Sequence, residues 1–302
     1  KSTYLIRQAN FVACHNPSYV DKYNMVQELV DGGTFLLNCS WDMEGLEEHL
    51  PGQVKSYIAN HNIKFYTIDG IKIGKEIGLG GRINTVLQSA FFKLAAIIPE
   101  EEAIDLMKAA AKATYGRKGD KIVQMNYDAI DAGAKQVVEI AVPESWKDAA
   151  DEGLTTPHVG EGGRADVVDF VKNIQAKVNA QEGNTLPVSA FNEYVDGSTP
   201  SGSSAYEKRG IAVDIPIWQP DNCIQCNRCA YVCPHAVIRP IALTEEEAAN
   251  APEGMDMIDM IGMPNMKFSI AVSAYDCTGC GSCANVCPGK KGEKGLVMGN
   301  ME

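Results

Sequence analysis

The sequence has little positive charge and no long apolar run. It contains 27 Lys and Arg against 39 Asp and Glu, which gives a formal net charge of −12. Because nucleic-acid binding needs clustered positive charge, this balance argues against nucleic acid as a partner. No apolar run reaches the roughly 18 residues of a membrane span, and the amino-terminal KSTYLIRQAN lacks the apolar core of a signal peptide. We therefore expect no nucleic-acid partner and no membrane partner.

Common catalytic and cofactor motifs are missing as well. Neither H-E-x-x-H nor G-x-S-x-G occurs. The stretch GLGGRIN at 78–84 approaches G-x-G-x-x-G without completing it, and it follows an expected helix where that motif requires a strand, which argues against a nicotinamide cofactor. Cys14 and His15 are adjacent near an expected strand end, where neighbouring side chains point to opposite faces, so no Cys–His pair is expected. Cys14 and Cys39 are expected to pack in the core.

Cysteine, in contrast, is concentrated in two short runs. Eight of the ten cysteines lie in these runs, and both runs fit C-x2-C-x2-C-x3-C-P. That spacing is typical of proteins with two [4Fe-4S] clusters. Zinc also uses C-x2-C pairs and is the alternative, but two complete runs with the trailing proline favour clusters. A disulfide framework would be spread along a small domain, so we expect a reducing, cytoplasmic compartment.

The assignment of cysteines to the two clusters follows from the pairing of the runs. In paired ferredoxin runs the fourth cysteine reaches the cluster of the other run. We therefore predict one cluster on the first three cysteines of the earlier run and the last of the later run, namely Cys223, Cys226, Cys229 and Cys287. The other cluster is predicted on Cys277, Cys280, Cys283 and Cys233.

The first 150 or so residues alternate between strand and helix patterns. Strands are expected at 4–16, 34–40 and 63–69, and helices at 17–33, near 51–62, at 82–98 and at 100–116. Such alternation predicts a Rossmann-like, mainly parallel open sheet with helices on its faces, and ligands usually bind such sheets at the carboxyl ends of the strands.

The remaining residues predict a small domain followed by an α+β ferredoxin-like domain. A Gly cluster at 160–163 runs into a short helix, a Gly/Ser-rich linker covers 196–210, and LPVSAF and GIAVDIPIW on either side of it are expected to be extended. Thr244 and Glu247 have capping-box spacing, which predicts a short inserted helix, and the Met-rich segment after it is expected to be a loop. The predicted domains are 1–160, 161–205 and 206–302.

Four stretches together resemble one known family, the pyruvate:ferredoxin (flavodoxin) oxidoreductases. They are QANFVACHNPSYVDKY, GLGGRINTVLQSAFFKLA, AYEKRGIAVDIPIWQPDNCIQCNRC and DCTGCGSCANVCP. The resemblance covers essentially the whole chain and implies the central part of a multidomain enzyme: a Rossmann-like domain that contributes to coenzyme A binding, a small EKR domain and a two-cluster ferredoxin domain. An initiator Met is absent, so the chain is expected to be one piece of a longer polypeptide whose first domain begins upstream.

The resemblance also implies an activity that this chain would share with other domains. Family members convert pyruvate and coenzyme A to acetyl-CoA and carbon dioxide, using thiamine diphosphate, Mg²⁺ and three [4Fe-4S] clusters, with ferredoxin or flavodoxin as acceptor. A homodimer of the full enzyme is expected. GRKGDKIVQMN lacks the second Gly and the paired Asn of the thiamine diphosphate signature. No catalytic residue is therefore expected in this chain.

The resemblance implies that coenzyme A contacts fall on Arg82, Asn84 and Asn126. An Asn amide can bridge a phosphate or a pantetheine amide, and Arg suits a phosphate. The alternative is structural: a helix-capping Asn84 and a turn at Asn126. For the whole chain, the alternatives are a freestanding iron–sulfur carrier, a related 2-oxoacid oxidoreductase, or an interaction module.

Overall fold

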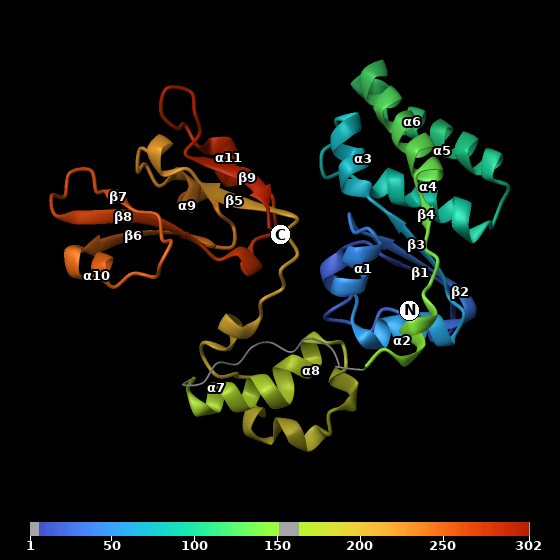
Figure 1. The fold of residues 1–302 in the computed structure, drawn as a ribbon, viewed down its shortest axis with the longest axis horizontal. Helices are drawn as coiled ribbons and strands as arrows, with labels where there is room; N and C mark the ends of the chain where they lie inside the picture. Colours follow the sequence, from blue (N-terminus) through green and yellow to red (C-terminus); the bar gives the residue numbers. More distant parts are fainter. Residues whose placement is uncertain (1–5, 151–162, 302) are drawn as a thin grey trace. The chain divides into compact units, whose positions relative to one another are not determined.

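The computed structural model describes residues 6–150 and 163–301, and the chain divides into two compact units, Lys1–Ser201 and Gly202–Glu302. The first unit is built on a four-stranded sheet of order β1-β2-β3-β4 (Figure 1). Its strands are β1 (Ala9–Cys14), β2 (Leu29–Asn38), β3 (Lys64–Ile68) and β4 (Val138–Glu139). The first three run parallel, and β4 pairs antiparallel with β3. The predicted Rossmann-like, mainly parallel sheet is confirmed.

Both faces of this sheet are covered, which explains why residues 35–37 of β2 are all apolar. Successive strand residues point to opposite faces. Phe35 and Leu37 of β2 therefore pack with Val54, Ile58 and other residues of one core. Leu36 packs in the core on the other face. A parallel sheet buried on both sides has no polar face to present to water.

Six α-helices of the first unit belong to the sheet region. They are α1 (Met43–His49), α2 (Gly52–Asn60), α3 (Gly70–Ile77), α4 (Asn84–Ala95), α5 (Glu100–Tyr115) and α6 (Asp120–Lys135). Short 3-10 turns lie at Pro17–Tyr19, Gly116–Lys118 and Glu144–Asp148. The helices expected near 51–62, at 82–98 and at 100–116 are confirmed. Tyr4 and Leu5, where the first strand was expected to begin, lie outside the described residues.

The helix expected at 17–33 is wrong. Only Pro17–Tyr19 is helical, and the Gly pair lies inside β2. The pairing of β1 with β2 is irregular between Ala9 and Phe11, so the extra residues of β2 bulge out, with Gly32 at a φ of 72°. The amide of Gly32 donates to the carbonyl of His61 at 2.9 Å. The glycine therefore marks a strand irregularity, which needs φ above zero for the same reason that a helix end does.

Residues 163–201 form a small helical segment. It contains α7 (Ala165–Phe170), a π-helical turn (Val171–Gln175) and α8 (Ala176–Asn179), followed by 3-10 turns at Gly183–Thr185 and Val188–Tyr194. The short helix predicted after the Gly cluster is confirmed. LPVSAF was expected to be extended and instead forms most of the last turn, where Phe170 packs edge-on against Tyr194 with ring centroids 5.1 Å apart.

The second unit contains two small antiparallel sheets. One pairs β5 (Asp214–Trp218) with β9 (Leu296–Asn300), and the other has the order β6-β8-β7. The strands of this second sheet are β6 (Ile238–Thr244), β7 (Ile258–Asp259) and β8 (Met266–Val272). The unit also contains the helices α9 (Arg228–Val232), α10 (Glu245–Ala249) and α11 (Ser282–Val286). Short 3-10 turns lie at Ser203–Tyr206, Pro220–Asn222 and Ala274–Asp276. This is the predicted ferredoxin-like unit.

The insertion between the two cysteine runs folds as the β6-α10-β7-β8 segment. The Thr244 hydroxyl accepts from the amide of Glu247 at 3.2 Å, and the Glu247 carboxylate accepts from the amide of Thr244 at 2.8 Å. The predicted capping box is therefore present. The Met-rich segment was expected to be a loop, but it contributes β7 and the start of β8. Across residues 6–150 and 163–301, no helix has the length and apolarity of a membrane span.

Candidate metal centres

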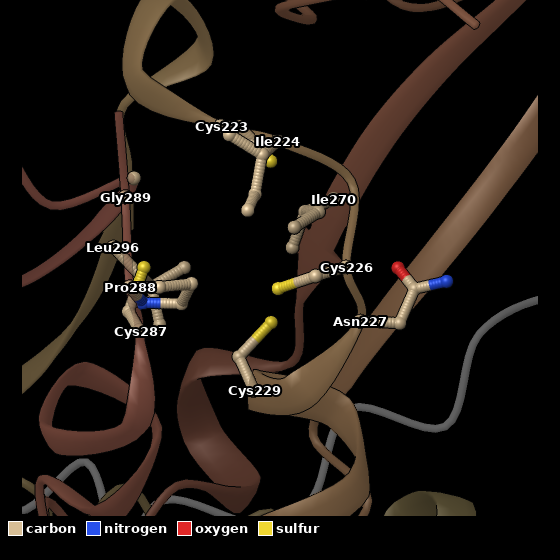
Figure 2. A pocket seen from close by; sticks show the side chains of 11 residues that line it. Cys223, Ile224, Cys226, Asn227, Cys229, Ile270, Cys287, Pro288, Gly289 and Leu296 are labelled. Carbon is tan, nitrogen blue, oxygen red and sulfur yellow. The ribbon is translucent and has the colours of Figure 1, made fainter. Parts of the chain in front are cut away.

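The first centre is a pocket lined by four cysteines from both runs. Cys223 and Cys226 come from the loop that leads into α9, Cys229 lies in the first turn of α9, and Cys287 follows the end of α11. Figure 2 shows their side chains around one pocket, to which Ile224, Ile270 and Leu296 add apolar walls. The pocket has about 330 Å³ of empty space, part of it continuous with solvent. The structure thus brings together the four cysteines that the sequence assigns to one cluster.

The second centre has the same plan with the roles of the runs exchanged. Cys277 and Cys280 precede α11, Cys283 lies in its first turn, and Cys233 reaches them from the end of α9. Its pocket is again about 330 Å³. The other lining residues are Pro216, Pro234, His235, Val237, Ile238, Thr278, Gly281, Ser282 and Met298. Each run therefore supplies three thiols to one pocket and one thiol to the other.

The two runs achieve this with the same backbone conformation. Gly279 and Gly281 have φ values of 69° and 72° in the later run. Gln225 and Asn227 occupy the matching positions of the earlier run, with φ values of 56° and 59°. Left-handed residues at these two points turn the chain tightly, so that thiols two residues apart face the same pocket. Gly adopts this conformation readily, whereas a residue with a Cβ carries a cost of roughly 1–2 kcal/mol.

The side chain of Gln225 is held by two hydrogen bonds that offset this cost. Its Nε2 donates to the carbonyl of Asp259 at 2.7 Å, and its Oε1 accepts from the amide of Ile261 at 2.8 Å. Both partners belong to the inserted segment, so one amide group ties that segment to the loop of the first centre. Gln225 was not predicted as a site residue from the sequence. The signal for it was a Gln where the later run has Gly279.

Backbone amides point at three of the cysteine sulfurs. The amides of Gln225, Gly279 and Val237 donate to the Sγ atoms of Cys223, Cys277 and Cys233 at 3.4, 3.3 and 3.4 Å, respectively. Hydrogen bonds to sulfur stabilise negative charge there and help to set the potential of an iron–sulfur cluster. The donor pattern therefore suits thiolate ligands.

Burial and hydrogen bonding shift the pKa values of three thiols. Burial raises the pKa of Cys229 to about 11 and raises the pKa of Cys283. A hydrogen bond with the Ser282 hydroxyl lowers the pKa of the exposed Cys280. Because a ligand must be deprotonated, iron binding at Cys229 would release a proton at neutral pH.

The donor set fits a polynuclear cluster. Each pocket offers four thiols, and soft thiolates suit iron–sulfur clusters as well as zinc. Within residues 6–150 and 163–301, no three His, Cys, Asp or Glu side chains are placed to hold a single metal ion. In each centre the four cysteines line one pocket that is partly open to solvent. Four cysteine thiols on one pocket are the ligand set of a [4Fe-4S] cluster.

The residues suggested for coenzyme A do not share one environment. Arg82 and Asn84 are exposed at the start of α4. Asn126 is 5% exposed in the middle of α6, where its Nδ2 donates to the carbonyl of Ile122 at 2.8 Å. The alternative prediction that Asn126 lies in a turn is wrong, because this residue lies within a helix. Asn84 is not the helix cap, because Ile83 precedes it in that position.

The other two cysteines lie in the core of the first unit. Cys14 and Cys39 are 1% and 6% exposed, and both pack in one apolar cluster. The Cys14 thiol donates to the carbonyl of Asn16 at 3.0 Å, and burial raises the pKa of Cys14 to about 12. They are packing residues, as predicted.

Comparison with known sequences agrees with this arrangement. Residues 1–136 match the family model described as pyruvate ferredoxin/flavodoxin oxidoreductase, and residues 161–212 match EKR, described as a domain of unknown function. Residues 222–291 match the 4Fe-4S dicluster domain. The last match and the cysteine runs support iron–sulfur clusters in the second unit.

Relatives match the chain over its whole length. Pyruvate-flavodoxin oxidoreductase of Enterobacter agglomerans is 48% identical over 302 residues, which cover 100% of this chain and 25% of that protein. Pyruvate:ferredoxin oxidoreductase of Moorella thermoacetica is 48% identical over 304 residues, with the same coverage. Pyruvate dehydrogenase [NADP(+)] of Cryptosporidium parvum is 42% identical over 311 residues, which cover 95% of this chain and 16% of that protein. The predicted resemblance is confirmed, and the chain spans about a quarter of the length of the first two relatives.

Proposed function

We propose that this chain, whose sequence matches pyruvate-flavodoxin and pyruvate:ferredoxin oxidoreductases over its whole length, is the electron-relay portion of such an enzyme. The observation that carries the proposal is the pair of four-thiol pockets. A [4Fe-4S] cluster supplies one-electron transfer when it is bound. The cysteines would hold the clusters, the amides of Gln225, Gly279 and Val237 would stabilise their negative charge, and the apolar walls would limit access of water.

The proposed ligands follow the geometry of the pockets. Those of the first centre are Cys223, Cys226, Cys229 and Cys287. Those of the second centre are Cys277, Cys280, Cys283 and Cys233. The order of the family segments supports the rest of the proposal: an oxidoreductase segment first, the EKR segment next and the dicluster segment last.

Two [4Fe-4S] clusters should give about eight iron atoms per chain. The test is to prepare the protein anaerobically and to measure iron, acid-labile sulfide and zinc, together with the absorbance of the oxidised and reduced forms. We expect broad visible absorbance that bleaches on reduction. About two iron atoms per chain, or stoichiometric zinc, would contradict the proposal and favour a structural metal site.

The complete enzyme would convert pyruvate and coenzyme A to acetyl-CoA and carbon dioxide. Thiamine diphosphate, Mg²⁺ and a third cluster would be held by its other domains, which would be the first partners of this chain. Ferredoxin and flavodoxin are the proposed acceptors, since both words occur in the names of relatives. We also propose a homodimer and a cytoplasmic location. The ten cysteines, none of which forms a disulfide, agree with the proposed location. A freestanding carrier remains the alternative, and the length of the natural polypeptide distinguishes the two.

Coenzyme A is proposed to contact Arg82 and Asn84 at the start of α4 more directly than Asn126 in α6. Replacing Asn84 by Ala in the complete enzyme should raise the KM for coenzyme A about tenfold, which equals about 1.4 kcal/mol, within the range of a single hydrogen bond. The KM for pyruvate should stay unchanged. Gln88→Ala, at another exposed position on the same helix, is the control. If Asn84→Ala leaves the dependence on coenzyme A unchanged, Asn84 has no part in binding.

A further inference from the structure

The EKR motif makes a specific contact beside the second centre. Lys208 Nζ forms an ion pair with the carboxylate of Asp276 and lies 3.3 Å from the Ser273 hydroxyl. The same hydroxyl donates to the Asp276 carboxylate at 2.6 Å. Asp276 immediately precedes Cys277, the first thiol of the second centre. The Lys208 ammonium is therefore fixed next to the start of a cluster-binding loop.

The residues after Lys208 lie along the same loop. The amide of Gly210 donates to the carbonyl of Tyr275 at 2.8 Å, and Ala212 is 5% exposed. A Cβ at Gly279 would lie 3.1 Å from the carbonyl oxygen of Asp214 and 3.5 Å from the Cβ of Ala212. We call residues 207–214 the EKR strap. The strap forms one wall of the loop from Tyr275 to Gly279.

The same network continues to the thiol that comes from the earlier run. The amide of Ser273 donates to the carbonyl of Val237 at 2.9 Å, and the amide of Val237 donates to Cys233 Sγ at 3.4 Å. Lys208, Asp276, Ser273 and Val237 thus form a chain of contacts that reaches both segments of the second centre. None of these four residues lines the pocket of the first centre.

We propose that the EKR strap positions the loop of the second centre and that its Lys208–Asp276 pair sets the reduction potential of the cluster held there. This assigns a role to a segment whose family is described only as a domain of unknown function. The inference rests on the proposed function, since it needs a cluster on Cys233, Cys277, Cys280 and Cys283.

The physical reason is the charge that a cluster gains on reduction. The potential of an iron–sulfur cluster depends on net charge, on hydrogen bonds to sulfur and on solvent exposure. A nearby positive charge favours the reduced form, which is more negative by one unit, and a nearby carboxylate disfavours it. Lys208 and Asp276 side chains are 41% and 26% exposed, so solvent screens the pair only in part.

The two partners should therefore act in opposite directions. Lys208→Met leaves the Asp276 carboxylate without its positive partner and should lower the reduction potential of the second cluster. At a fixed applied potential, the ratio of reduced to oxidised cluster should fall by up to about tenfold, which equals 59 mV for one electron. Asp276→Asn should increase that ratio. The double variant should lie close to the parent, and Lys208→Arg should keep the parent potential. A redox titration of the full chain followed by paramagnetic resonance measures each value, with the second cluster identified by the signal lost in Cys280→Ser.

Lys267→Met is the matched control. It removes another Lys–Asp pair of the same unit, in which Lys267 Nζ lies 2.5 Å from Asp259, and it should leave the second cluster unchanged. The inference would be overturned if Lys208→Met and Asp276→Asn shifted the reduction potential of the second cluster in the same direction, or if neither variant shifted it. The proposed function would still stand in that case, provided that both clusters are intact. A parent chain that binds no second cluster would refute the proposed function itself, and the inference with it.

Discussion

Replacing Cys233 by Ala should damage the cluster bound by the later run, although Cys233 belongs to the earlier run. The reason is its position in the second unit. Three thiols of the earlier run face the first pocket, but the chain then passes through α9, and Cys233 emerges beside Cys277, Cys280 and Cys283. Loss of one of four ligands should cost the second centre an iron atom or the entire cluster. Cys287→Ala should have the same effect on the first centre.

The measurement is the resolved paramagnetic resonance of the two reduced clusters in each variant, together with iron content. Cys39→Ala is a matched control, because it removes a buried cysteine from the first unit, outside both pockets. That variant should keep both signals and about eight iron atoms. If Cys233→Ala perturbs only the signal of the cluster on Cys223, Cys226 and Cys229, the crossed assignment is wrong.

Replacing Gly133 by Ala should destabilise the first unit by about 1–3 kcal/mol, the typical cost of overpacking a core. Gly133 lies in α6 where this helix meets α4. A Cβ there would stand 2.2 Å from the carbonyl oxygen of Val86 and 2.9 Å from the Cβ of Ser89. The helices cannot separate freely, because the Ser89 hydroxyl donates to the carbonyl of Ile130 at 2.6 Å. This steric cost exceeds the gain of roughly 1 kcal/mol that Ala brings to an open helix position.

The control for this variant is Gly116→Ala. Gly116 also has a helical φ of −54°, but no atom lies within 4 Å of a Cβ built on it. Its substitution should leave stability unchanged or raise it slightly. Denaturant unfolding followed by circular dichroism compares the two variants. A Gly133→Ala protein as stable as the parent would show that α4 and α6 pack less closely than described.

Local pattern was sufficient for the parts of the first unit where a single physical cause dominates. The strands at 34–40 and 63–69 were predictable because both faces of a parallel sheet are buried, which makes the strands apolar. The helix at 100–116 was predictable from its amphipathic pattern. The expected helix at 17–33 was wrong, because glycine with φ above zero serves a strand irregularity as well as a helix end.

Other errors have the same origin in long-range contacts. LPVSAF carries apolar residues suited to a strand but forms a 3-10 turn, in which Tyr194 packs against Phe170. The Met-rich segment has the composition of a loop, but its residues Ile258 and Asp259 form β7, which pairs with β8. Asn126 is a residue typical of turns, yet it is buried inside α6. In each case the tertiary partner was absent from the local pattern.

For the metal centres, cysteine count and spacing already specified the ligand chemistry, since thiolates two residues apart can grip one cluster whatever surrounds them. The rule of paired runs also predicted that the fourth cysteine of each run lies with the other run, and the two pockets group the cysteines in this way. Folding decided which contacts accompany these thiols, because those contacts join residues far apart in the chain. Gln225 reaches Ile261, and Lys208 reaches Asp276, only when the inserted segment and the EKR strap have packed against the cysteine loops. Hydrogen bonds and ion pairs act over a few ångströms, so their partners are determined by the tertiary structure.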